Sequence, residues 1–106
     1  STVDAIRARL RDTDLFCRSG GEEFLVLMPN AAEIEGLGIA ERLRLAVKET
    51  VARVGDAEIR ITVSIGLAFD DRRGADVEEL MREADAALYR AKASGRDRVE
   101  RSPAGS

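Results

Sequence analysis

The chain has 106 residues, of which 44% are apolar and 35% charged, and its formal net charge is −3. This length and composition suit one domain with one core, which we expect to span residues 1–101, followed by a frayed tail at 102–106. The nearly balanced charge excludes a general attraction to nucleic acid polymers or anionic membranes. Histidine is absent and cysteine occurs once, which excludes His-based triads and an internal disulfide.

The sequence shows neither a signal peptide pattern nor an apolar run long enough to cross a bilayer. We therefore expect a cytoplasmic location for this segment, within a parent that other domains could anchor to a membrane. Without histidine, acid–base or metal chemistry would have to use carboxylates. Cys17 lies inside a strand pattern, and we expect it to be a small core residue.

The first pattern along the chain is helical. Val3, Ile6 and Leu10 recur at helical spacing, which indicates the closing turns of an amphipathic helix over residues 3–12. Asp12-Thr13-Asp14 ends that pattern and leads into the next element.

Two apolar stretches, 15–17 and 24–28, then flank Gly20-Gly21. This arrangement predicts two strands joined by a tight turn, a β-hairpin, in which glycine supplies positive backbone torsions and lets a ligand approach the main chain. Glu22 and Glu23 are adjacent, so on a strand their side chains would leave opposite faces. Turn chemistry alone leaves two interpretations open: a solvated hairpin end, or a pocket that uses one of the glutamates.

Pro29 and Asn30 predict the end of the second strand, because proline cannot donate in a central ladder and asparagine can cap a helix. One helix is then predicted by the apolar stripe Ile34, Leu37, Ala40, Leu43, Val47 and Val51. Strict alternation over 59–67 predicts a half-buried strand with Ile59, Ile61, Val63, Ile65 and Leu67 on one face.

A second helix is predicted after Asp76, which stands at an N-cap position. Its apolar stripe is Val77, Leu80, Met81, Ala84, Leu88 and Ala91. Ser94-Gly95 should end it, and residues 98–100 could add a short strand. Strands interleaved with helices that pack on one face predict an α+β sandwich.

The turn Gly20-Gly21-Glu22-Glu23-Phe24 resembles the signature of the GGDEF family, the diguanylate cyclases, whose turn reads Gly-Gly-(Asp or Glu)-Glu-Phe. A second stretch, Tyr89-Arg90-Ala91-Lys92-Ala93-Ser94-Gly95-Arg96, is similar to the family's closing Tyr-x-Ala-Lys-x-x-Gly-Arg. The resemblance implies a ferredoxin-like, nucleotidyl-cyclase-type βαββαβ sandwich. The family's first strand and following helix have no counterpart here, so the chain covers about two-thirds of that domain.

The resemblance also implies an activity: two GTP molecules are condensed into cyclic di-GMP and pyrophosphate with Mg²⁺ or Mn²⁺. Glu22 would be the metal ligand and general base, and Glu23 would support catalysis from a neighbouring position. Gly20 and Gly21 would let the nucleotide lie against the hairpin.

Lys92 and Arg96 correspond to family residues that contact the substrate phosphates. Four residues apart, they are expected on one side of a helix end. Helix physics alone would explain them as ordinary cations that complement the helix dipole.

A third constellation is Arg11-Asp12-Thr13-Asp14. In the family an Arg-x-x-Asp motif ending five residues before the Gly-Gly turn forms the inhibitory site for the product, cyclic di-GMP. Position selects Arg11 and Asp14, and Arg42 matches a secondary arginine of that site. The alternative is a helix-end ion pair worth ~0–1 kcal/mol.

The family's metal-sharing aspartate and its guanine-reading Asn and Asp would precede residue 1. Because Mg²⁺ normally takes more oxygen ligands than Glu22 supplies, we expect this chain alone to be inactive. An uncovered sheet edge would favour a homodimer, or the chain would be a piece of a longer enzyme with an upstream sensory domain.

Two other interpretations stay open. The chain could be a non-catalytic receptor that binds cyclic di-GMP through Arg11 and Asp14. It could also be a purely structural α+β domain, if both motifs are accidental.

Overall fold

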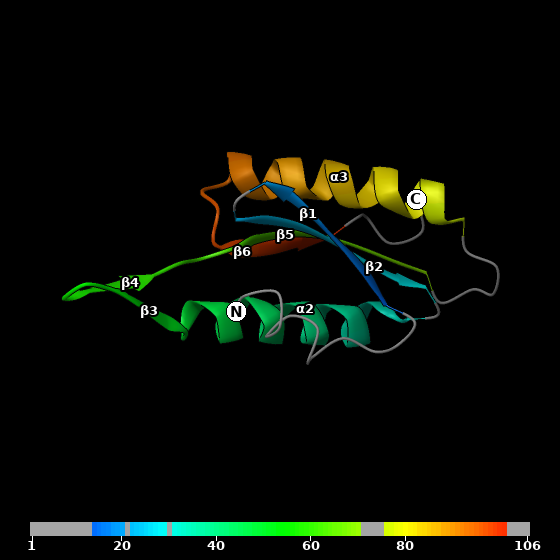
Figure 1. Ribbon diagram of the computed structural model, residues 1–106. Coiled ribbons are helices and arrows are strands. Elements are labelled where there is room, and N and C mark those ends of the chain that lie inside the picture. The colour runs from blue at the N-terminus through cyan, green and yellow to red at the C-terminus, as the bar shows by residue number, and fades with distance from the viewer. Residues whose placement is uncertain (1–13, 21, 30, 71–75, 102–106) are drawn as a thin grey trace.

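The computed structural model describes residues 14–20, 22–29, 31–70 and 76–101, and they form a sheet with a helix on each side (Figure 1). The helix expected over 3–12 and the tail expected at 102–106 lie outside this part of the chain. The elements are β1 (Leu15–Gly20), β2 (Glu23–Pro29), α2 (Glu33–Lys48), β3 (Val51–Val54), β4 (Ala57–Arg60), β5 (Ser64–Asp70), α3 (Val77–Ala93) and β6 (Arg98–Arg101).

The predicted hairpin is present. β1 and β2 pair antiparallel from Leu15 opposite Leu27 to Gly20 opposite Glu23, with a shift of register before Gly20. β2 ends at Pro29 as predicted, since proline has no N–H to donate to the ladder.

The main sheet has the strand order β1-β2-β5-β6 and is mixed. β5 runs parallel to β2 on one side and to β6 on the other, so each pair is joined by a crossover that contains a helix. The α+β architecture expected from the sequence is confirmed. The expectation that the helices pack on one face is wrong: α2 and α3 cover opposite faces (Figure 1).

Each face of the sheet has its own core. On the α2 side the buried residues include Phe24, Val26, Met28, Ile39, Ala40, Leu43, Val47, Val63, Ile65 and Leu67. On the α3 side they are Leu25, Leu27, Ala68, Leu80, Ala84 and Leu88. Neighbouring residues of one strand thus enter different cores, as the period of two requires.

The strand predicted over 59–67 is wrong in its bounds and in its burial. β4 ends at Arg60, residues 61–63 are not in a strand, and β5 begins at Ser64. β5 is buried on both faces from Ser64 to Ala68, because α2 covers one face and α3 the other. A strand inside a parallel sheet has no exposed face for alternation to reveal.

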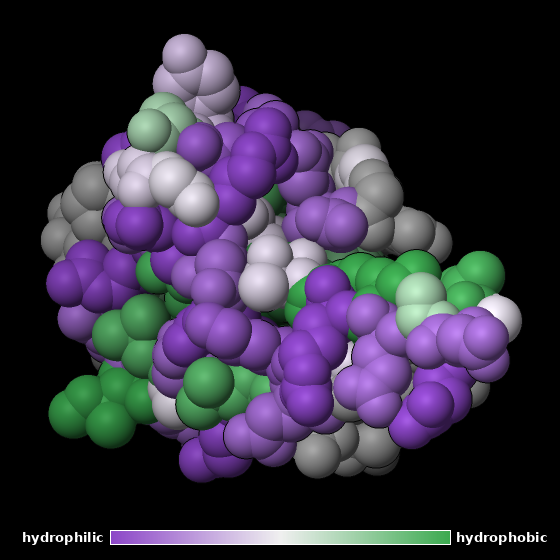
Figure 2. All heavy atoms as spheres, turned by 90° about the vertical axis from the view of Figure 1, so that its left-hand side faces the viewer, coloured by the Kyte–Doolittle hydropathy of each residue, from purple (hydrophilic) through white to green (hydrophobic). Residues whose placement is uncertain are grey.

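A hairpin made of β3 and β4 projects from the end of α2 (Figure 1). The sequence did not predict it: Val51 was assigned to the helical stripe but begins β3, since α2 stops at Lys48. Gly55 turns the hairpin with a φ of 62°. Figure 2, seen from this end, shows hydrophobic groups in separate places among hydrophilic ones.

Cys17 and Ile34 were both expected on buried faces, but both lie outside the core. Cys17 is exposed because β1 is an edge strand of the sheet. Ile34 is 87% exposed in the first turn of α2, and the N-cap of this helix is Ala32 without a side-chain hydrogen bond.

The second helix matches its prediction in its start and end, but Val77 of the predicted apolar stripe is 47% exposed. Asp76 caps it by accepting a hydrogen bond from the backbone N–H of Glu78 at 3.0 Å, and the helix ends at Ala93 before Ser94 and Gly95. The short final strand is also confirmed as β6. Within the described residues, neither helix is long and apolar enough to cross a membrane.

Gly66 decides how closely α3 approaches the sheet. A Cβ atom at this position would lie 2.1 Å from the carbonyl oxygen of Ala84 and 2.5 Å from the backbone nitrogen of Leu88. Both obstacles are helix backbone and cannot turn aside. Glycine at position 66 is therefore a packing requirement.

We expect Gly66→Ala to lower the free energy of unfolding by roughly 2–3 kcal/mol or more, because it overpacks the contact between β5 and α3. Urea unfolding followed by circular dichroism measures this. Gly38→Ala is the matched control: its Cβ would have 3.8 Å to the nearest atom, of Arg42, so the better helix propensity of alanine should stabilise by up to ~1 kcal/mol. Equal effects of the two variants would contradict the packing argument.

Candidate functional site

The Gly-Gly turn lies beside the start of β5. Glu22 is exposed in the turn, and its carbonyl oxygen accepts a hydrogen bond from the backbone N–H of Ser64 at 2.9 Å. Gly21 lies outside the described residues. Gly20 does not have a positive φ, so the torsional reason given for a glycine here is wrong at this position.

Gly20 instead leaves room for a neighbouring carboxylate. Glu23 pairs with Gly20 across the hairpin. A Cβ atom on Gly20 would lie 2.9 Å from Oε1 of Glu23. A side chain at position 20 would require the Glu23 carboxylate to shift from this position. The missing side chain thus shapes the site through Glu23.

Glu23 receives both predicted cations. Nζ of Lys92 lies 3.3 Å from Oε1, and Nη1 of Arg96 lies 3.2 Å from Oε2. The side chain of Glu23 is 19% exposed, against 33% for Lys92 and 59% for Arg96. The two motifs found in the sequence therefore meet at one carboxylate in the structure.

This contact has a plain electrostatic consequence. The hydrogen bond from Arg96 lowers the pKa of Glu23 below its usual value, partial burial opposes this, and Lys92 lowers the pKa further. The carboxylate is ionised at neutral pH and holds two cations whose outer parts face solvent. An anionic ligand that arrives here would meet donors already gathered in one place.

Arg96 reaches Glu23 from a left-handed turn that follows α3. The φ angles of Gly95, Arg96 and Asp97 are 115°, 63° and 47°. The N–H of Arg96 donates to the carbonyl of Ala91 at 2.9 Å, which closes the end of the helix. The sequence predicted that Ser94-Gly95 would end the helix, and the structure places Arg96 beyond that end. There it has left-handed backbone, which costs a residue other than glycine about 1 kcal/mol or more.

Asp97 ties this turn to α2. Its Oδ1 accepts a hydrogen bond from Nη1 of Arg44 at 2.7 Å, and its Oδ2 accepts one from Nζ of Lys48 at 2.8 Å. Arg44 also donates to the carboxylate of Glu41, so its guanidinium joins two carboxylates. Sequence reasoning missed this cluster, since its charges resemble an ordinary solvated helix face.

The cluster shifts the pKa values of Asp97 and Arg44. The hydrogen bond from Lys48 lowers the pKa of Asp97, against partial burial, and that from Arg44 lowers it further. Glu41 first, and then Asp97, raise the pKa of Arg44 above its usual range. Asp97 and Arg44 are therefore charged at neutral pH.

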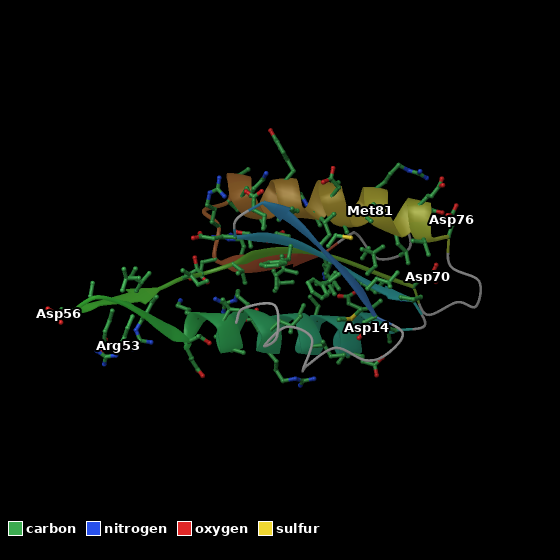
Figure 3. All side chains as sticks on the ribbon, in the orientation of Figure 1. Asp14, Arg53, Asp56, Asp70, Asp76 and Met81 are labelled. Carbon is green, nitrogen blue, oxygen red and sulfur yellow. The ribbon has the colours of Figure 1, made fainter. Side chains whose placement is uncertain are left out.

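The predicted inhibitory site is only partly described. Asp14 is 8% exposed and precedes β1, so it lies at the opposite end of that strand from the Gly-Gly turn; Figure 3 shows it near the sheet on the α2 side. Arg42 is exposed on α2, and Arg11 lies outside the described residues.

The donor set bears on metal binding. Among the residues that the structure describes, no three His, Cys, Asp or Glu side chains form a metal-binding group. Glu22 offers one exposed carboxylate, which suits a Mg²⁺ ion that takes its other ligands from nucleotide phosphates and water. Glu22 thus supplies part of the ligand set of a metal that arrives with a nucleotide.

Comparison with known proteins decides the family. Residues 1–98 match the family model described as the GGDEF domain of diguanylate cyclases. The chain belongs to the GGDEF family. The match covers the hairpin, both helices and the left-handed turn.

Among curated relatives, the response regulator PleD of Caulobacter vibrioides is 43% identical over 97 residues, which cover 89% of this chain and 21% of PleD. Diguanylate cyclase DgcP of Pseudomonas aeruginosa is 42% identical over 96 residues, covering 90% of this chain and 14% of DgcP. The chain thus spans about a fifth or less of the length of these relatives.

Two solved structures carry the same fold. The GGDEF domain of DgcB from Caulobacter crescentus, in complex with c-di-GMP, has a TM-score of 0.74 and 26% identity, with 95% of this chain and 60% of that chain covered. Diguanylate cyclase SiaD of Pseudomonas aeruginosa, in complex with its activator SiaC, has a TM-score of 0.74 and 33% identity, with 94% and 38% covered.

The depressed pKa of Asp97 predicts how stability depends on pH. Because the pKa is lower in the folded chain, the carboxylate's contribution is fully present above its usual value of 3.8 and is lost as pH falls through the folded pKa. We expect the stability difference between the native chain and Asp97→Asn to shrink below about pH 4. Urea unfolding of both proteins from pH 3 to 7 measures it. A difference that stays constant over this range would contradict the ion pairs.

Proposed function

We propose that this chain is part of the catalytic domain of a diguanylate cyclase, which condenses two GTP molecules into cyclic di-GMP and pyrophosphate. Family membership supports the class. The observation that carries the assignment to this site is the meeting of Lys92 and Arg96 at Glu23, beside the exposed Glu22 of the turn.

The reaction requires a ribose 3′-hydroxyl to attack the α-phosphorus of a second GTP, forming one P–O bond as the bond to pyrophosphate breaks. A bound Mg²⁺ or Mn²⁺ would neutralise charge on the phosphates and lower the pKa of the hydroxyl. Glu22 would hold that metal and accept the proton. Glu23 would support catalysis by keeping Lys92 and Arg96 in place before the nucleotide arrives.

The two cations suit a triphosphate. Lys92 presents a compact ammonium and Arg96 a planar fork, and both can form charge-assisted hydrogen bonds to phosphate oxygens. Gly20 and Gly21 present backbone without side chains at the turn, so the nucleotide could lie against it.

The assembly would be a homodimer in which each domain holds one GTP, because the product joins two nucleotides symmetrically. An upstream sensory or regulatory domain in the parent would control it. Since the described residues offer Glu22 as a single exposed carboxylate at the turn, we also propose that residues 1–106 alone do not turn over GTP.

A second candidate function is binding of cyclic di-GMP without catalysis, through Arg11, Asp14 and Arg42. Asp14 is buried at the end of β1 farthest from the turn, as a separate inhibitory site would require. The relative DgcB was solved in complex with c-di-GMP.

The substrate site is tested by calorimetric titration of the chain with a GTP analogue that carries a β,γ-imido bridge, in the presence of Mg²⁺. We expect Lys92→Ala and Arg96→Ala each to weaken binding by about ten-fold or more, since each removes a charge-assisted hydrogen bond. Arg53→Ala is the control: it removes an exposed cation whose partner is Glu58. Binding that is indifferent to Lys92 and Arg96 would refute the assignment.

The metal dependence is a separate prediction. We expect Mg²⁺ to bind the chain weakly without nucleotide, and Glu22→Gln to remove most of the enhancement that Mg²⁺ gives to analogue binding. Titrations with and without Mg²⁺ measure both. An undiminished Mg²⁺ effect in Glu22→Gln would remove Glu22 from the metal site.

The inhibitory site is tested by titration with cyclic di-GMP. We expect the native chain to bind, and Arg11→Ala to reduce affinity by at least about ten-fold because it removes a guanidinium fork. Lys92→Ala should leave this binding unchanged. A folded native chain that does not bind would remove Arg11, Asp14 and Arg42 from the functional residues.

A further inference from the structure

Arg96 has left-handed backbone, and its side chain contacts Glu23 at the start of β2. It lies between Gly95 and Asp97 in a run of three positive φ angles, and its side chain is the more exposed of the two cations on Glu23. Left-handed backbone at residues other than glycine persists only where the surroundings determine it. The direction of the Arg96 side chain therefore depends on whatever holds this turn.

Besides the hydrogen bond from the Arg96 N–H to the Ala91 carbonyl of α3, two contacts that hold the turn come from α2. Arg44 and Lys48 each donate to one oxygen of Asp97, at 2.7 and 2.8 Å. In addition, the guanidinium of Arg98 donates through Nε to the Arg96 carbonyl at 3.2 Å. The turn is thus restrained at Asp97 by two side chains of α2 and at the Arg96 carbonyl by Arg98.

Arg44 is suited to this task. Its side chain is 14% exposed, against 49% for Lys48, and Glu41 holds the opposite side of the same guanidinium. A planar group held on two sides has one orientation, whereas an exposed ammonium can follow its partner. Arg44 therefore fixes the position of the Asp97 carboxylate relative to α2.

We propose that Arg44 and Asp97 are positioning residues for Arg96, which orient its guanidinium toward the nucleotide phosphates without touching them. This inference rests on the proposed function for its ligand. It assigns α2 a part in the site, although this helix carries none of the residues proposed to contact substrate.

A second ion pair of α2 provides a matched control. Oε1 of Glu33, at the start of α2, lies 3.0 Å from Nε of Arg101 in β6. Like the pair of Arg44 and Asp97, it joins α2 to the segment that follows α3, and its members are partly exposed. It does not adjoin Arg96.

The first experiment is a double-mutant cycle on analogue binding with Mg²⁺. We expect Arg44→Gln and Asp97→Asn each to weaken binding of the imido analogue by about five-fold, and Glu33→Gln to leave it unchanged. In an Arg96→Ala background, Arg44→Gln should have no further effect, because Arg44 acts through Arg96. Equal losses with and without Arg96 would overturn the proposal.

The second experiment needs no ligand. Amide ¹⁵N relaxation should show residues 95–97 ordered in the native chain, with order parameters near ~0.85, and mobile in Arg44→Gln, near ~0.6 or below. Glu33→Gln should leave these amides ordered. Order retained in Arg44→Gln would overturn the proposal.

The two readouts separate the possible failures. A native chain that does not bind the analogue refutes the substrate site, and the relaxation data still decide whether Arg44 orders Arg96. If Arg44→Gln does not fold, Asp97→Asn decides both measurements, because asparagine tolerates left-handed backbone and keeps the shape of aspartate.

Discussion

The parallel pairing of β2 with β5 is the constraint on which the rest of the structure depends. It aligns Glu23 with Ser64 and continues to Pro29 opposite Asp70. α3 then runs back along β5, so its C-terminal end returns to the level of Ser64. For this reason Lys92 and Arg96 lie beside Glu23, 69 and 73 residues away in the chain. The close approach of α3 at Gly66 sets how near those cations come.

At the site, one carboxylate organises two cations before any ligand is present. Ordering two long side chains costs conformational entropy. Because the contacts to Glu23 already order Lys92 and Arg96, less entropy would be lost when a ligand binds. A triphosphate would share or replace Glu23 as their acceptor. The same logic extends outward, because Asp97 is itself held by α2. The proposed substrate site is thus supported from the sheet and from both helices.

Prediction from the sequence succeeded where local signals were strong. The hairpin, the cap at Asp76 and the end of α3 before Ser94 follow from turn residues, a capping aspartate and a helix terminator. Prediction failed where burial depends on distant neighbours. β5 alternates in sequence but is buried on both faces. Cys17 was predicted to be a core residue but lies on an edge strand that α3 does not cover.

The sequence by itself determined the residue types of the site: the Gly-Gly-Glu-Glu turn, Lys92 and Arg96, and through them the family. Tertiary structure alone decided that both cations converge on Glu23 and that Asp97 links the turn after α3 to Arg44. The reason is physical. Motifs are set by local chemistry, whereas contacts between residues tens of positions apart depend on strand order and on which face each helix covers.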